Sequence, residues 1–183
     1  MTQVNLITPL IRTSISEGRG ALAIKAELCH PYGSHKARAV GAIMDSYEKE
    51  GRLTRWSGQI VADSSGGNLA KAVALESIRR GYKPYACIER SYSLSNKEIF
   101  CSLGGTLIEQ LPDKSAFESI QEWFADCDQK AIYLNQFNNI ANLEGHKNET
   151  GGEIRRQLDE CYGSKVNVPN LCLVGGMGSG ASL

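Results

Sequence analysis

Positive charge is not in excess in this sequence, because 20 lysine and arginine residues are balanced by 20 aspartate and glutamate residues. Proteins that bind nucleic acid use basic surfaces to neutralise phosphates, so nucleic acid is not an expected partner. Long apolar runs are missing as well, since nowhere do roughly 18 apolar residues follow one another as a membrane helix requires. The first residues contain no basic segment followed by an apolar one, which a secretory signal would need. We therefore expect a cytoplasmic protein without a membrane partner.

Closely spaced cysteine pairs are also absent. No C-x-x-C occurs among the six cysteines, which are Cys29, Cys87, Cys101, Cys127, Cys161 and Cys172. Cys87 and Cys172 lie inside apolar runs, so reduced and buried thiols are the expected state. Cys29 precedes His30, but no second ligand pair follows at the spacing of a zinc site. We therefore expect no metal.

Two periodicities alternate along the chain. Helical spacing places Val40, Ile43, Met44 and Tyr47 on one face of a helix that Gly51 ends. Further helices are expected after residue 68, over 96–103, around 117–124 and around 154–158. Six short apolar runs have the length of strands: 21–26, 59–62, 84–88, 106–109, 131–134 and 171–174. Strands that alternate with helices in this way predict an α/β fold, with parallel sheets flanked by helices.

Lys36 lies in the first of three loops that can carry chemistry. In open α/β sheets, ligands collect where a strand leads into a helix, and residues 31–36 occupy such a junction. The positive end of the helix dipole disfavours a charged lysine there and tends to lower its pKa. A neutral amine can form an imine with an aldehyde cofactor. The loop alone leaves open that Lys36 is an ordinary solvated lysine.

Glycine and serine dominate the other two loops. Residues 64–68 read S-S-G-G-N and again lie between a strand and a helix, where open backbone N–H groups suit a carboxylate or a phosphate. A purely structural glycine turn remains an alternative there. Residues 175–182 read G-G-M-G-S-G-A-S, which is typical of a phosphate-binding loop. Gly176, Gly178 and Ala181 match the dinucleotide pattern only weakly, and no Lys-Ser/Thr ending supports a Walker-type site.

Several motifs stand in the order in which one known family has them. Residues 33–38, G-S-H-K-A-R, are similar to the family's G-S-x-K-D-R, and residues 65–69 to its T-S-G-N-T. Residues 136–142 are similar to Q-F-x-N-P-A-N, and residues 178–182 to the G-T-G-G-T phosphate cup. Together they resemble, almost end to end, the fold-type II family of pyridoxal-phosphate enzymes in the cysteine synthase and cystathionine β-synthase branch.

This resemblance implies the fold-type II architecture and a role for each loop. Lys36 would bind pyridoxal 5′-phosphate as a Schiff base and transfer a proton. Cofactor contacts would also come from Asn68, Gly178, Ser179, Gly180, Ala181 and Ser182. The amino-acid substrate would be bound by Ser65, Gly66, Gly67, Asn68, Leu69 and Gln136. The implied domains are residues 1–38 and 142–183, both of a large domain, and 39–141 of a small α/β domain, in a homodimer.

The expected activity is β-replacement on an activated serine-type amino acid, as in cysteine synthase. Gly66 and Leu69 stand where the family has hydroxyl residues, which slightly favours a second possibility, β-elimination of the serine or threonine dehydratase kind. The family continues past the phosphate cup, whereas this sequence stops at Leu183. We therefore expect a fragment of a longer enzyme or a chain that needs a partner. An inactive relative that acts by binding is the non-enzymatic alternative.

Overall fold

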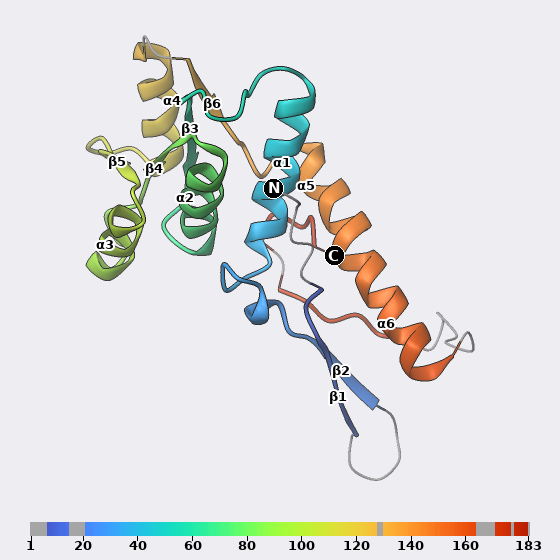
Figure 1. Cartoon of the computed structure of the whole chain (residues 1–183). Helices are drawn as coiled ribbons and strands as arrows, with labels where there is room; N and C mark the ends of the chain where they lie inside the picture. The colour runs from blue at the N-terminus through green and yellow to red at the C-terminus, as the bar shows by residue number, and fades with distance from the viewer. Residues whose placement is uncertain (1–6, 15–20, 128–129, 164–170, 177, 183) are drawn as a thin grey trace.

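The structure is a computed structural model that describes residues 7–14, 21–127, 130–163, 171–176 and 178–182. Within these ranges the chain builds a four-stranded parallel sheet and a separate two-stranded antiparallel hairpin (Figure 1). The predicted α/β class with parallel strands and flanking helices is confirmed. No helix in the described ranges has both the length and the apolar character needed to cross a membrane.

The parallel sheet has the strand order β5-β4-β3-β6. Its strands are β3 (Ile60–Ser64), β4 (Lys83–Cys87), β5 (Thr106–Ile108) and β6 (Ala131–Tyr133). All four coincide with predicted apolar runs to within about two residues at either end. Because neighbouring strands are parallel, their carboxyl ends meet at one edge of the sheet. The loops that follow β3, β4 and β6 therefore leave from the same edge.

The central strand β3 is buried on both faces, as expected for a parallel sheet covered by helices. Successive side chains of a strand point to opposite faces, so Val61 joins one cluster while Ile60 and Ala62 join another. The first cluster is shared with α1 (Lys36–Lys49) and α2 (Asn68–Arg80), and the second with α4 (Ala116–Asp126). The helix α3 (Leu94–Ser102) packs beside α2 and β5.

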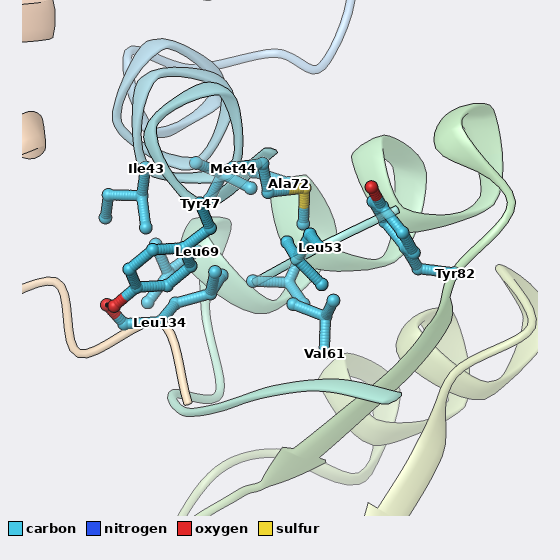
Figure 2. Packing of buried hydrophobic residues seen from close by; sticks show 11 residues of the cluster. Ile43, Met44, Tyr47, Leu53, Val61, Leu69, Ala72, Tyr82 and Leu134 are labelled. Carbon is cyan, nitrogen blue, oxygen red and sulfur yellow. Dashed lines mark hydrogen bonds between the residues drawn. The ribbon is translucent and has the colours of Figure 1, made fainter. Parts of the chain in front are cut away.

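The helix α1 confirms its sequence prediction. Val40, Ile43, Met44 and Tyr47 are all buried in the cluster that Figure 2 shows, with Leu69 and Leu134 arriving from other elements. The two neighbours of α1 in space are α2 and α5 (Ile140–Gly145). Figure 1 shows α1 running between them, so it joins the sheet to the C-terminal helices.

The C-terminal helices form one nearly continuous run. After α5 come a π-helical turn, η3 (His146–Gly151), and α6 (Gly152–Tyr162). At the other end of the chain β1 (Leu10–Ser14) pairs antiparallel with β2 (Ala21–Lys25), and the short helix η2 (Glu27–Cys29) follows. Figure 1 shows this hairpin projecting away from the parallel sheet. The strand β1 and the helix α5 were not predicted from periodicity.

Two sequence predictions are wrong. Residues 171–174 form no strand, and Leu173 and Val174 are 60% and 87% exposed. An apolar run becomes a strand only when a neighbouring strand supplies hydrogen-bond partners, and no described strand pairs with residues 171–174. The prediction of buried cysteines fails with it, since Cys172 is exposed and only Cys87 is buried. The six cysteines are thiols rather than disulfides, as expected.

Candidate functional site

The candidate site lies where α1 begins beside the loop after β6. Lys36 is the first residue of α1, and its Nζ donates a hydrogen bond of 3.1 Å to Oε1 of Gln136. These two residues are 100 positions apart in the sequence, yet both were predicted to belong to the site. Burial lowers the pKa of the Lys36 amine, against the opposing effect of the Asp63 carboxyl. A lowered amine pKa favours the neutral, nucleophilic form.

The start of α1 is fixed by a buried charge network. Nε of Arg38 donates to Glu27 of η2 at 2.8 Å, and Nη1 donates to Glu153 of α6 at 2.7 Å. Lys25 of β2 donates to the same Glu153 carboxylate at 2.6 Å. Charge-assisted bonds to two separate elements hold the first turn of α1 in place. Since Lys36 lies two residues before Arg38, this network also positions the Lys36 backbone.

Gln136 connects Lys36 to the C-terminal loop. Its side chain is buried, and its backbone carbonyl accepts a hydrogen bond of 2.8 Å from Nδ2 of Asn142. The same Asn142 amide group lies 3.4 Å from the Ser179 hydroxyl oxygen. Asn142 is almost fully buried, and its Oδ1 has no hydrogen-bond partner among the described residues. It therefore ties the loop after β6 to the predicted phosphate cup.

A pocket of about 370 Å³ opens between these two loops. Gln136 and Asn139 line one side, and Ser179, Gly180 and Ala181 line the other. Gly180 has a φ of 78°, a left-handed conformation that suits glycine and lets successive backbone N–H groups converge. Gly178 and Ser182, predicted to belong to the same cup, are exposed beside it. The structure thus brings Gln136 and the cup together around one pocket.

The predicted substrate loop, residues 65–69, leads from β3 into α2. Asn68 is exposed at the first position of α2, with Gly67 as its N-cap. Leu69 is 2% exposed because its side chain packs into the cluster beneath α1, so only its backbone can face a ligand. A Cβ added to Gly66 would lie 2.8 Å from the ring of Tyr92, in the loop after β4. Position 66, where the family has a hydroxyl residue, is therefore crowded by an aromatic ring that packs against the loop.

Asp63 is a site residue that the sequence analysis missed. It lies near the carboxyl end of β3 and is 2% exposed, and burial raises its pKa to about 7. The backbone N–H of Ser64 donates to its Oδ1 at 2.7 Å. The available signal was a carboxyl directly after the apolar run 59–62 and before a glycine loop, because carboxyls are seldom buried unless they are paired.

The two histidines near Lys36 serve packing. The rings of His35 and His146 lie 5.7 Å apart, and Nδ1 of His146 is 2.9 Å from the Thr150 hydroxyl oxygen within η3. Burial, with the nearby His35 and Lys36, lowers the pKa of His146 to about 4. The neutral, buried, hydrogen-bonded imidazole of His146 is suited to packing rather than to accepting a proton.

Comparisons with known proteins show the family to which the chain belongs. The family model described as "Pyridoxal-phosphate dependent enzyme" matches residues 1–183. A cysteine synthase of Haemophilus influenzae is 32% identical over 181 residues, covering 96% of this chain and 54% of the relative. Cysteine synthase A of Escherichia coli K12 is 30% identical over 181 residues, covering 96% of this chain and 52% of the relative.

The solved structures extend the comparison to the fold. The crystal structure of O-ureido-L-serine synthase superposes with a TM-score of 0.74 at 25% identity, covering 87% of this chain and 50% of that one. The predicted fold-type II architecture is thereby confirmed. The chain spans about half the length of the curated relatives it matches.

Proposed function

Because this chain belongs to the family of pyridoxal-phosphate dependent enzymes, we propose that it contributes the site for β-replacement on an activated serine-type amino acid. The observation that carries the proposal is the hydrogen bond of 3.1 Å between Lys36 and Gln136. It joins the motif that resembles the family's cofactor-binding segment to the motif that resembles its Q-F-x-N segment. The relatives that are 30% identical or more include cysteine synthases, whose name describes the synthesis of an amino acid.

The described residues fit the cofactor. Pyridoxal phosphate needs an amine that is neutral near physiological pH, and the half-buried Lys36 has a lowered pKa. It also needs donors for a phosphate dianion, which the Ser179 hydroxyl and the left-handed Gly180 backbone can supply beside the pocket. When bound, the cofactor supplies an electron sink for charge developing at the substrate α-carbon.

We assign the remaining work to four parts of this chain. Lys36 would hold the cofactor through its amine, and its Nζ would accept the α-proton of the substrate. Gln136 and the loop 65–68 hold the substrate carboxylate, with backbone N–H groups replacing the absent hydroxyls of Gly66 and Leu69. The cup 178–182 orients the phosphate. Asn142, bonded to Gln136 and adjacent to Ser179, keeps the substrate side and the phosphate side in register.

β-Elimination is a second candidate because of the substrate loop. Leu69 buries its side chain in the core, and Tyr92 lies against Gly66, so this loop offers fewer side-chain donors than a hydroxyl-rich loop would. Fewer donors would hold the substrate carboxylate less firmly, which would favour early release of the elimination product. Hydrolysis of that product gives a keto acid and ammonia. Product analysis separates the two reactions, since replacement gives a new amino acid and elimination gives a keto acid.

The attachment site can be tested directly. The chain is loaded with pyridoxal phosphate, reduced with borohydride, digested and mapped by mass spectrometry. We expect the label on Lys36 and its loss in Lys36→Arg, while Lys49→Arg, at the exposed end of the same helix, keeps it. A label on another lysine, with Lys36 unmodified, would refute the assignment.

A further inference from the structure

Asp63 has an unusual environment for a carboxyl group. It is 2% exposed, its Oδ1 accepts the Ser64 N–H at 2.7 Å, and its Oδ2 has no hydrogen-bond partner among the described residues. A buried polar atom without a partner costs free energy, so folding alone would favour an apolar side chain on this strand. A carboxyl kept at such a position, at the strand end beside the site, is a candidate for a functional role.

Gln136 connects this carboxyl to Lys36. The strand β6 pairs parallel with β3, and the N–H of Leu134 donates to the carbonyl of Ala62 at 3.0 Å, so the loop that continues into Gln136 runs beside Asp63. The Gln136 side chain accepts a hydrogen bond of 3.1 Å from Nζ of Lys36. This loop therefore lies between Asp63 and Lys36. Asp63 arrives from β3 and Lys36 from α1, so three separate elements converge.

We propose that Asp63 is a positioning residue whose charge sets the protonation state of the Lys36 amine. The inference rests on the proposed function, since it concerns how the same lysine changes between its charged and its neutral form. A carboxylate near an ammonium group stabilises the charged lysine, whereas a protonated carboxyl does not. Burial disfavours both charged forms, so the two groups titrate as a coupled pair rather than one by one.

The other titratable groups around the pair are few. Tyr133 of β6 faces Asp63, and burial with the Asp63 charge raises its pKa to about 12, so its phenol stays neutral. His35 and His146 lie on the Lys36 side, where burial lowers the pKa of each. Both imidazoles are therefore neutral near pH 7. Asp63, whose pKa is raised to about 7, is the group in this set that changes charge near neutrality.

The test measures the reactivity of the Lys36 amine without any cofactor. The whole chain is labelled with trace acetic anhydride between pH 5 and pH 10, and the Lys36 peptide is quantified by mass spectrometry. In Asp63→Asn, which keeps the shape and removes the charge, we expect labelling at pH 7 to rise about three- to tenfold, about half to one pKa unit. In the wild type we expect the labelling of Lys36 to change with pH in two coupled steps. In Asp63→Asn it should follow a single titration.

A charge-matched control comes from the loop that follows the neighbouring strand. Glu89, in the loop after β4, also accepts two hydrogen bonds, from the Gln110 side chain and the Ala116 N–H. Glu89→Gln should leave the Lys36 profile within about twofold of the wild type, because no contact joins Glu89 to Lys36 in the described part of the chain. A Lys36 profile that is the same in Asp63→Asn and the wild type, with circular dichroism unchanged, overturns the inference.

A second measurement covers the case in which Asp63→Asn does not fold. Carbon-13 NMR of the wild-type Asp63 carboxyl should show its titration near pH 7, with a step in Lys36 labelling at the same pH. A Lys36 labelling profile without a step at the pH where Asp63 titrates overturns the inference. The borohydride label bears on the proposed function alone, so an unchanged Lys36 profile with the label on Lys36 would refute only the role of Asp63.

Discussion

Gly145 offers a sharp test of how α5 packs on α1. It ends α5 with helical backbone angles, φ −59° and ψ −50°, so alanine there meets no backbone strain. An added Cβ would lie 2.4 Å from Cβ of Ala42 in α1, a separation that real Cβ atoms do not reach. Alanine gains about 1 kcal/mol over glycine in a helix, but overpacking costs about 1–3 kcal/mol. We therefore expect Gly145→Ala to be neutral or destabilising by up to about 2 kcal/mol.

Gly152 is the matched control, and Ala42 gives the rescue. Gly152 is also helical, at φ −61° and ψ −39°, and nothing lies within 4 Å of its added Cβ. Gly152→Ala should therefore stabilise by about 1 kcal/mol. Urea unfolding with equal m values measures both changes. Adding Ala42→Gly to Gly145→Ala should recover about 1–3 kcal/mol as a coupling energy. If Gly145→Ala stabilises as much as Gly152→Ala, the close packing of α1 on α5 is refuted.

Two further predictions concern the charge network and the substrate loop. Arg38→Met leaves Glu27 and Glu153 without their main partner and should cost about 3–5 kcal/mol in urea unfolding at pH 7. Burial raises the native pKa values of Glu27 and Glu153, but their hydrogen bonds to Arg38 outweigh it and lower both, so this stability is present above about pH 4.5 and lost as pH falls through the lowered values. In Arg38→Met those bonds are gone, so the acid-induced loss of stability should be smaller than in the wild type, and an identical pH dependence would contradict this. Gly66→Ser should lower thermal stability, by about 1–3 kcal/mol, because its Cβ would lie 2.6 Å from the Ile88 side chain and 2.8 Å from the Tyr92 ring. Tyr92→Ala in the same chain should recover part of that loss, and a stable single variant would disprove the clash.

The helices and parallel strands were predictable because their signals are local. The helix α1 carries apolar residues at helical spacing, and α2 ends at Gly81, whose φ of 78° is the left-handed cap that a glycine supplies. The strand β1 was missed because only five residues beside Pro9 carry its signal, and its pairing with β2 supplies the rest. Residues 171–174 failed for the opposite reason, since an apolar run cannot show whether a partner strand lies next to it.

The candidate site depends on long-range contacts, which periodicity does not encode. The contact between Lys36 and Gln136 spans 100 positions, and only the resemblance of both segments to one family predicted that they meet. Asp63 was within reach of the sequence, because it directly follows the apolar run 59–62, one residue before β3 ends. Its environment depends on the loop after β6, which the fold brings beside β3 and whose Gln136 side chain bonds to Lys36. A parallel sheet gathers strand ends from distant parts of the sequence at one edge. A single carboxyl there can therefore act on a lysine that no local pattern relates to it.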